Sequence, residues 1–476
     1  MSSLHLLSAA RLADLVRART VSPVQLVELH LERIARLNPR LNAFAAVDAG
    51  GALAAARETE RALAAGAPAG PLCGVPVTIK SAIDVAGLRT ETGSRMRVGQ
   101  VAAADAPLVE RLRRAGAIVL GNTNAPELLM AYETDNLLHG RTNNPWDLDR
   151  TAGGSSGGEA AAIAAGLSAG GFGSDGGGSV RVPAHFTGIC ALKPTPGRVP
   201  STGHFPPGLG PFALIGVVGP MARTVEDLAL LCEAVVGPEA GDAASVPVDW
   251  RPPPESEVRA AVVGYFEDDG ATPVTPETRA AVRAAVAAAK RAGFTTRAFR
   301  PSGLERARDL WWVMFGLAGG FVIRPSVALN EQDTSPILRE FLSLVADEPP
   351  LSATRLMDAW IGRDRLRLGL LEEMRDVPVF LCPACSIPAF RHGERQWTVD
   401  GATVRYLRRP DIFTYTQWFN LLGNPALVMP GGRSPEGLPI GVQVVGRPYK
   451  DELVLEVGAR IEHELGAYQP PPLASE

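Results

Sequence analysis

Two glycine clusters that contain serine mark the part of this chain that could carry chemistry. They read GGSSGG, beginning at Gly153, and GSDGGGS, ending at Ser179. Glycine at this density raises the entropic cost of ordering the chain, so it is favoured where the backbone must approach a ligand closely. Ser155 and Ser179, one in each cluster, are therefore the first candidates for a nucleophile. A serine hydroxyl is a weak nucleophile until a base activates it, so the chain must also supply a base.

Two other motifs overlap these clusters, and neither fits its context. Gly171–Gly176 satisfies the nucleotide-binding pattern GxGxxG, but no acidic residue follows about 20 positions later, where the chain reads Thr195–Arg198. Gly153–Gly157 satisfies GxSxG, the nucleophile elbow of α/β-hydrolases, which requires an acid and then a histidine downstream. Among the downstream histidines, His392 lies in a polar turn and His463 on a terminal helix, without a catalytic signature. We therefore favour hydrolysis by a serine that does not use histidine.

The five cysteines predict neither a disulfide framework nor a metal centre. Cys382 and Cys385 form a CxxC pattern, but they continue the apolar run Val377–Leu381, and no second ligand pair is visible. We interpret them as small residues that end a buried strand, in preference to a redox or zinc site. Neither a metal ion nor another cofactor is expected.

Lys80 supplies a base when the motifs are taken together. It ends an apolar run and precedes Ser155 by 75 residues, and Ser155 precedes Ser179 by 24 residues. With the two glycine clusters and the segment Leu192–Thr195, these residues closely resemble the amidase signature family. Both spacings are those usual for that family's lysine and paired serines. The resemblance spans roughly residues 8–465 and includes the segments Asn122–Asn124, Asn144–Trp146 and Gly437–Gln443.

The resemblance implies a role for each of the three residues. Ser179 would be the nucleophile that forms an acyl-enzyme, and Ser155, on a cis peptide bond, would relay the proton of Ser179 to Lys80. Lys80 can act as a base only when it is neutral, and burial at a strand end lowers the pKa of a lysine. We therefore predict catalysis by Lys80, Ser155 and Ser179, in preference to a solvated lysine and a glycine-rich linker.

The residues around Ser179 are expected to stabilise the charge that develops during the reaction. The resemblance implies an oxyanion hole made by the backbone N–H groups of Gly176, Gly177, Gly178 and Ser179. Asp175 and Arg181 flank this loop with opposite charges, and we expect them to pair and hold it rigid. Ser156 either assists by hydrogen bonding or caps the helix that follows it. Gly176 stands where the family commonly has threonine, isoleucine or alanine, which predicts a more flexible loop.

The expected substrate is an amide with an apolar acyl group. Leu129 and Met130 follow the Asn-Thr-Asn segment, where family members place the acyl-binding wall. Trp311, Trp312 and Phe315 lie in the helical region that usually covers the site in the family. However, Trp311 and Phe315 are four residues apart, as on any buried helix face, so both pocket and core are open for them. A mostly apolar pocket favours aryl or alkyl acyl groups.

The elements that must position these residues predict an α/β protein, a single large amidase-signature domain whose central mixed β-sheet is covered by α-helices on both faces. Residues 1–70 are expected to form an N-terminal helical arm, in which Ser22–Gln25 begins a helix and Asn38-Pro39 ends it. The catalytic domain is expected over residues 71–465, with a surface connection near 237–256 and a loose tail at 466–476.

Hydrophobic periodicity places individual elements within that domain. Strands are predicted at Val75–Ile79, Ile118–Leu120, Ala260–Phe266, Val377–Leu381, Ala426–Met429 and Ile440–Val445. Helices are predicted at Pro107–Arg114, Pro126–Tyr132, Pro276–Ala292 and 451–465, and across most of 303–375.

The charge and hydropathy of the chain limit the classes of partner that it can bind. The net charge of -4 and the dispersed arginines offer no attraction to polyanions, so nucleic acid is not expected. The longest uncharged apolar run, Leu310–Ile323, has 14 residues, too few to span a bilayer. The N-terminus lacks the pattern of a signal peptide, so a cytoplasmic protein is expected. The partner that remains is a small-molecule amide, and a homodimer is left open.

These observations predict hydrolysis of a carboxylic amide to an acid plus an amine or ammonia. One alternative is the glutaminase subunit of a tRNA-dependent amidotransferase, which has the same three residues and needs a partner protein. The segments Glu133–Asn136 and Gly140–Pro145 resemble stand-alone aryl- or fatty-acid-amide hydrolases more closely. A second alternative is a non-catalytic amidase-like binding protein, which the presence of all three residues disfavours.

Overall fold

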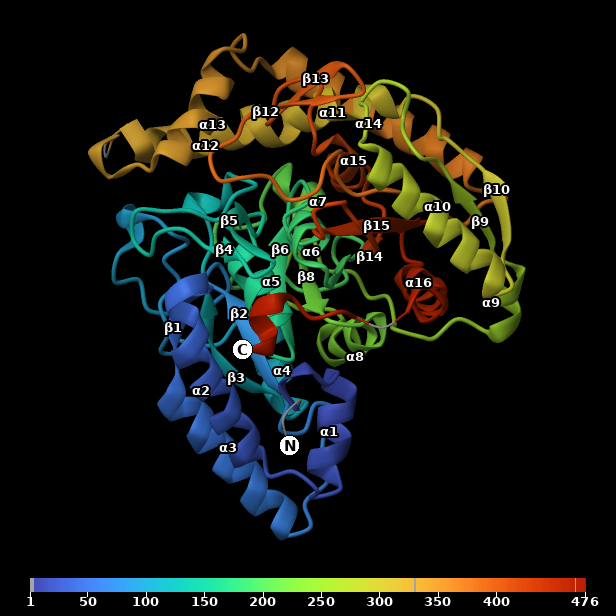
Figure 1. Ribbon diagram of the computed structural model, residues 1–476. Helices are drawn as coiled ribbons and strands as arrows, with labels where there is room; N and C mark the ends of the chain where they lie inside the picture. The colour runs from blue at the N-terminus through green and yellow to red at the C-terminus, as the bar shows by residue number, and fades with distance from the viewer. Residues whose placement is uncertain (1–3, 329–330, 467) are drawn as a thin grey trace.

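An eleven-stranded sheet runs through the protein, as the computed structural model shows (Figure 1). The structure describes residues 4–328, 331–466 and 468–476. Across the sheet, the strands follow the order β1 (Phe44–Val47), β3 (Ile118–Thr123), β2 (Pro76–Lys80), β6 (Gly170–Asp175), β8 (Val217–Ala222), β7 (Cys190–Lys193), β14 (Ala426–Arg433), β15 (Pro439–Gly446), β11 (Val379–Pro383), β9 (Val262–Tyr265) and β10 (Thr295–Ala298). β2 pairs in parallel with β3 and β6, whereas β6 and β8 are antiparallel. The predicted mixed sheet is therefore confirmed.

Helices flank this sheet and build the layer beyond it. The α-helices are α1 (Ala9–Arg17), α2 (Pro23–Leu41), α3 (Ala49–Ala64), α4 (Pro107–Arg114), α5 (Gly157–Ala164), α6 (Arg181–Thr187), α7 (Phe212–Ile215), α8 (Val225–Val235), α9 (Glu255–Ala260), α10 (Pro276–Arg291), α11 (Ala307–Trp311), α12 (Ala318–Ala328), α13 (Pro336–Ala346), α14 (Ala353–Glu373), α15 (Thr414–Leu422) and α16 (Asp451–Leu465). Short 3-10 turns and one π-helical segment are η1 (Leu4–Leu6), η2 (Arg95–Arg97), η3 (Glu127–Leu129), η4 (Leu304–Arg306), η5 (Trp312–Leu317), η6 (Glu331–Asp333) and η7 (Pro472–Ser475). Two small hairpins, β4–β5 (Asn143–Asn144, Asp147–Thr151) and β12–β13 (Gln396–Val399, Ala402–Arg405), lie outside the main sheet.

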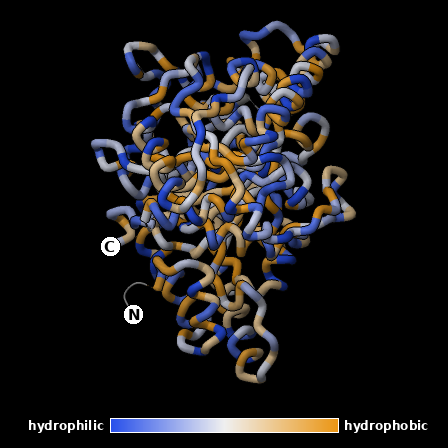
Figure 2. The backbone as a smooth tube through the Cα atoms, turned by 90° about the vertical axis from the view of Figure 1, so that its right-hand side faces the viewer, coloured by the Kyte–Doolittle hydropathy of each residue, from blue (hydrophilic) through white to orange (hydrophobic). Residues whose placement is uncertain are grey.

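Successive residues of the central strands face two different layers, as the alternation of a β-strand requires. In β14, Leu427 and Met429 pack into the core that contains α4, α8, α10 and α16, while Val428 packs against α5 and α6. In β2, Val77 and Ile79 join the first core, so Thr78 and Lys80 point to the α5 side. Figure 2 shows the hydrophobic segments concentrated in the interior and the hydrophilic ones outside. The side chain of Lys80 thus enters the buried layer between the sheet and α5.

Two predictions for the N-terminal helices need correction. Residues 44–47 form β1 at the sheet edge, which a four-residue run could not signal against the helical pattern around it. α2 continues through Pro39 to Leu41, instead of ending at Asn38. A proline in the last turn removes only one helical hydrogen bond, and the helix ends where Asn42 adopts a left-handed conformation.

The helix predicted at Pro126–Tyr132 is also wrong, because only the short turn η3 forms there. Leu128 and Leu129 both have positive φ, and the Leu128 N–H donates to the Thr92 carbonyl at 2.9 Å. The carboxylate of Glu127 accepts hydrogen bonds from other segments, including one of 2.8 Å from Ser94. These tertiary bonds replace the helical ones that the hydrophobic pattern predicts.

The C-terminal segment expected to be a loose tail ends in η7, where Leu473 and Ala474 are buried. Arg33 of α2 donates a hydrogen bond of 3.0 Å to the Ala474 carbonyl, which fixes the segment against the N-terminal helices. The connection expected near 237–256 contains no helix or strand up to residue 254, but its last two residues begin α9 at Glu255. Within the described parts of the chain, no helix is both long enough and apolar enough to cross a membrane.

Candidate active site

Lys80 is completely buried at the end of β2 and contacts two serines. Its Nζ lies 2.6 Å from the Oγ of Ser155 and 3.1 Å from the Oγ of Ser174. Burial lowers the pKa of Lys80 to about 7, although the nearby carboxylates of Asp175 and Glu159 act in the opposite direction. A large fraction of Lys80 is therefore neutral near neutral pH, and a neutral amine can accept a proton.

Ser155 lies where the chain enters α5, and the Gly154–Ser155 peptide bond is cis. The next residue, Ser156, makes no side-chain cap to α5. Its Oγ instead donates to the Ser174 carbonyl and accepts from the Ser174 N–H, both at 3.3 Å. Its backbone N–H donates to the Ser179 carbonyl at 3.1 Å. Ser156 therefore does not cap α5, and its hydrogen bonds tie the two glycine clusters together.

The loop Gly176–Ser179 joins β6 to α6, and two of its carbonyl groups are held in place. Trp311 Nε1 donates to the Gly176 carbonyl at 2.8 Å, and Tyr132 Oη donates to the Gly177 carbonyl at 2.7 Å. A Cβ on Gly177 would lie 2.5 Å from Tyr132 Oη and 2.6 Å from the Trp311 ring. The C=O and N–H of one peptide unit point in opposite directions. These bonds therefore turn the N–H groups of Gly177 and Gly178 away from the two aromatic residues.

Three of the four N–H groups expected in the oxyanion hole are available. Those of Gly176, Gly177 and Ser179 have no hydrogen-bond acceptor in the part of the chain that the structure describes. The Gly178 N–H donates to Asp175 Oδ1 at 2.7 Å. This corrects the expectation that Gly178 joins the hole, because the carboxylate already occupies its N–H.

The predicted pair of Asp175 and Arg181 is present and wholly buried. Arg181 Nε donates to Asp175 Oδ2, and Arg181 Nη2 donates to Asp175 Oδ1, both at 3.0 Å. Burial alone would raise the pKa of Asp175, but Arg181 and the amide of Asn420 hold it well below its ordinary value. The ionised Asp175 also accepts from the N–H groups of Gly178 and Val180. The pair therefore fixes the backbone on both sides of Ser179.

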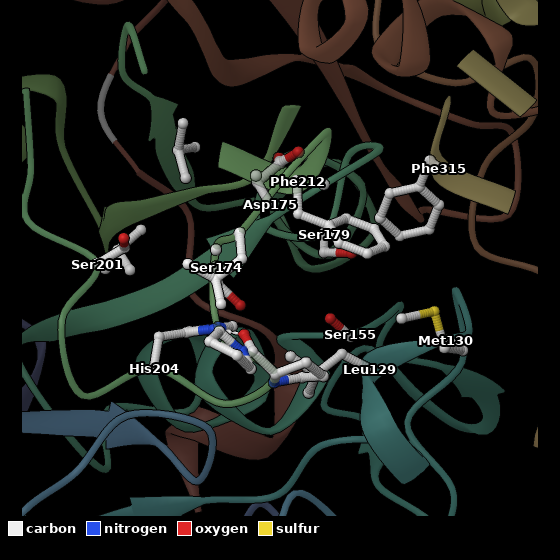
Figure 3. Close-up of a pocket in the computed structure, with 18 of the residues that line it drawn as sticks. Leu129, Met130, Ser155, Ser174, Asp175, Ser179, Ser201, His204, Phe212 and Phe315 are labelled. Carbon is white, nitrogen blue, oxygen red and sulfur yellow. Dashed lines mark hydrogen bonds between the residues drawn. The ribbon is translucent and has the colours of Figure 1, made fainter. Parts of the chain in front are cut away.

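A cavity of about 290 Å³ opens onto these groups (Figure 3). Ser155, Ser174, Ser179 and Ser201 are the hydroxyl-bearing residues that line it. Its apolar lining includes Leu129, Met130, Leu209, Phe212, Val217, Val218, Phe315 and Ile323. Leu129 and Met130 thus line the cavity that contains Ser155 and Ser179.

The three aromatic residues of the 311–315 region have different positions. Phe315 lines the cavity and fills the space beside Gly176, where an added Cβ would lie 2.6 Å from its ring. Trp311 stacks on Phe315 with ring centroids 4.8 Å apart and supports the glycine loop from behind. Trp312 packs edge-on against Phe341 in the helical core. Phe315 thus belongs to the pocket, Trp311 to its support and Trp312 to the helical core.

Sequence reasoning assigned no role to two polar residues of the cavity, Ser174 and His204. Ser174 is the second hydroxyl on Lys80, and its place before Asp175 at the end of β6 could have identified it. His204 reaches the site because it forms an isolated antiparallel bridge with Ile83, three residues beyond Lys80. Burial lowers the pKa of His204 to about 4, and Lys80 adds to this effect, so the imidazole is neutral.

The competing motifs lie elsewhere or in other conformations. Gly171–Gly176 is mostly the interior of β6 and contains no helix start. His463 is exposed on α16, and His185 is buried with its ring nitrogens bonded to the Ile387 carbonyl and to Gly441. Cys382 lies in β11, and Cys385 lies just beyond the end of this strand. Both are free, buried thiols. The described residues contain no group of histidine, cysteine and acidic side chains that could hold a metal ion.

Comparisons with known proteins identify the family to which the chain belongs. The model of the family described as Amidase matches residues 25–455. An acylamidase from Rhodococcus erythropolis is 34% identical over 473 residues, which cover 97% of this chain and 96% of that protein. One of the subunits of the glutamyl-tRNA(Gln) amidotransferase of Roseiflexus castenholzii is 33% identical, with 96% of each chain covered. A solved structure of a bacterial aryl acylamidase of the amidase signature family superposes with a TM-score of 0.86 at 26% identity, covering 100% of this chain and 99% of that one.

Proposed function

This chain belongs to the amidase signature family and is an amide hydrolase, and from that premise we propose that Ser179 forms an acyl-enzyme with Ser155 and Lys80 as its proton relay. The buried contact of 2.6 Å between Lys80 Nζ and Ser155 Oγ is the observation that carries the proposal. A lysine with a lowered pKa in contact with one serine, close to a second serine in a glycine loop, has the groups that base-assisted attack on an amide requires.

The relay accounts for each proton. Neutral Lys80 takes the proton of Ser155, which takes the proton of Ser179 as Ser179 Oγ attacks the amide carbonyl. When the tetrahedral intermediate collapses, the C–N bond breaks and the nitrogen leaves with a proton returned through Ser155. Water then attacks the Ser179 ester by the same relay and releases the acid.

The oxyanion that forms during each attack needs hydrogen-bond donors placed in advance. We assign this role to the N–H groups of Gly176, Gly177 and Ser179, which lack acceptors among the described residues. Asp175 and Arg181 hold the loop in this arrangement, so little reorganisation is needed when charge develops.

The acyl group is proposed to be aryl or alkyl, because the cavity wall is mostly apolar. Met130, Phe212 and Phe315 offer contact surface to such a group. The names of the acylamidase and aryl acylamidase relatives support an acylated amine as the substrate.

The relative from Roseiflexus castenholzii supports a second candidate, a glutaminase subunit that works with a partner protein. Glutamine carries a polar amino acid head, which the apolar lining of this cavity would bind poorly. Hydrolysis of simple aryl and alkyl amides by the purified chain, with little glutamine turnover, would favour the stand-alone enzyme.

The direct test of the proposal is covalent labelling. Ser179→Ala should abolish amide hydrolysis and leave the fold intact, and a sulfonyl fluoride probe should label Ser179 in the unaltered enzyme. Ser201→Ala is the matched control, because Ser201 lines the same cavity but its hydroxyl donates to Asp242. Mass mapping that places the label on Ser155 alone would contradict the assignment. A chain without any amide hydrolysis would instead support a binding protein.

A further inference from the structure

A buried carboxyl group, Glu159 of α5, lies beneath Lys80 and has no part in the proposed relay. It is wholly buried in the first turn of α5, one turn after Ser155. Thr78 Oγ1 donates to Glu159 Oε1, and Thr123 Oγ1 donates to Glu159 Oε2 at 2.7 Å. Such a group costs free energy to bury, so its position calls for a physical reason.

The two threonines define where this carboxyl lies relative to Lys80. Thr78 precedes Lys80 by two residues on β2, so the two side chains lie on the same face of the sheet. Thr123 is the residue of β3 that pairs directly with Lys80. Gly171 of β6 leaves the remaining space, since a Cβ there would lie 2.1 Å from Glu159 Oε1. The carboxyl therefore sits under the base of the Lys80 side chain, enclosed by three strands and α5.

Glu159 differs from the other titratable groups near Lys80, because no ion pair among the described residues balances its charge. Asp175 also approaches Lys80, but its charge is balanced by the ion pair with Arg181. His204, on the remaining side, is neutral. Glu159 has hydroxyl partners and forms no ion pair among the described residues, and Lys80 is the charge that acts on it.

From this arrangement we infer that Glu159 is a positioning residue that sets the protonation state of Lys80 and thereby the pH at which the enzyme becomes active. The inference rests on the proposed function, because it requires Lys80 to be the base. Burial raises the pKa of Glu159 to about 7, against the effect of its threonine bonds and of Lys80. The pKa of Lys80 lies in the same region, so an ionised Glu159 favours the Lys80 cation and a neutral Glu159 favours the free amine.

The test is the pH dependence of kcat/KM for an aryl amide, measured in the unaltered enzyme and in Glu159→Gln. The glutamine keeps the size of the side chain and one accepting oxygen but removes the negative charge, and its NH2 group donates where the second carboxylate oxygen accepted. The pKa of Lys80 should then fall, so the rising limb should move to lower pH by about one unit, with the plateau rate largely kept. A residue with only a structural role would lower the rate or the stability without moving the limb.

Two further variants keep the test decisive. Thr123→Val removes one donor to the carboxylate, so Glu159 should be neutral over a wider pH range and the limb should move in the same direction by less. This variant decides the matter if Glu159→Gln does not fold. Glu462→Gln is the matched control, because Glu462 is another largely buried glutamate, on α16, bonded to Val225 and Cys190. The rising limb of the pH profile of Glu462→Gln should superimpose on that of the unaltered enzyme.

The outcomes separate this inference from the proposed function. A limb that stays in place in folded Glu159→Gln and Thr123→Val, while Ser179→Ala and Lys80→Ala are inactive, would overturn the role of Glu159 alone. Retained activity in Ser179→Ala or Lys80→Ala would overturn the proposed mechanism, however the Glu159 variant behaves. A shift to higher pH would also refute the inference, because it has the opposite sign.

Discussion

At the scale of single residues, Lys80 shows how burial can create a base. A lysine in water is protonated at neutral pH and cannot accept a proton. At the end of β2, Lys80 is buried away from water, and the uncharged hydroxyl groups of Ser155 and Ser174 contact its Nζ. The pKa of Lys80 therefore falls to about 7, where the free amine and the cation coexist.

The pH profile follows from that pKa. Because the proposed relay requires the amine form of Lys80, kcat/KM should rise with pH through about 7 and level off above it. Lys80→Ala should lose most of the rate together with this limb. Lys80→Arg should not restore activity, since a guanidinium stays protonated. An active Lys80→Arg variant, or a rate independent of pH between 5 and 9 in the unaltered enzyme (a range of about two units on either side of that pKa), would refute the assignment of Lys80 as the base.

At the scale of elements, the glycine loop depends on helices that lie far from it in the sequence. α11 contributes Trp311 to the Gly176 carbonyl, and the first turn of α15 contributes Thr416 to the Gly177 carbonyl at 2.7 Å. Figure 1 shows these two helices close together above the sheet. The orientation of the loop is therefore a property of the helical layer as well as of the glycines.

Trp311→Phe tests this support. The phenyl ring can keep the stacking on Phe315, but the N–H that binds the Gly176 carbonyl is lost. Leaving a buried carbonyl without its partner costs about 1–3 kcal/mol. If that cost falls on the transition state, kcat should drop by roughly tenfold with little change in KM. Trp312→Phe is the control, because Trp312 packs in the core without contacting the loop. This substitution should lower Tm and leave kcat largely unchanged. Equal effects of the two substitutions on kcat would count against the prediction.

At the scale of the whole molecule, the cavity exists because three regions meet above the sheet. Met130 comes from the segment after β3, Phe212 from α7 and Phe315 from η5. None of these regions forms an apolar pocket by itself. Packed together around a few hydroxyl groups, they form the apolar concavity typical of small-molecule sites.

Substrate preference should therefore follow acyl hydrophobicity. Each methylene buried in the cavity contributes about 0.8 kcal/mol, so kcat/KM should rise by roughly fourfold per added methylene until the cavity of about 290 Å³ is filled. A series of linear acyl amides, assayed beside glutamine, measures this slope. Phe315→Ala should lower the slope without removing activity on small acyl groups. Turnover of glutamine or acetamide equal to that of a long-chain or aromatic amide would exclude this substrate class.

The sequence by itself determined the groups that lie close together along the chain. Ser155 and Ser156, and Asp175 through Arg181, belong to two short segments, and their spacing with Lys80 was enough to identify the family. The mixed sheet and most long helices were also predicted, because their hydrophobic periodicity extends over whole elements. Short elements were missed where few residues carry the pattern, as in β1, or where tertiary hydrogen bonds prevailed, as at Leu128.

Tertiary structure alone decided how these groups are used. That Ser174 contacts Lys80 and that Glu159 lies beneath Lys80 depend on strand register and helix placement. The lowered pKa of Lys80 likewise arises from burial between β2 and α5, which no single segment encodes. The physical reason is that residue type and spacing specify which groups can react, whereas dielectric environment and hydrogen-bond direction depend on elements that meet only in the folded chain.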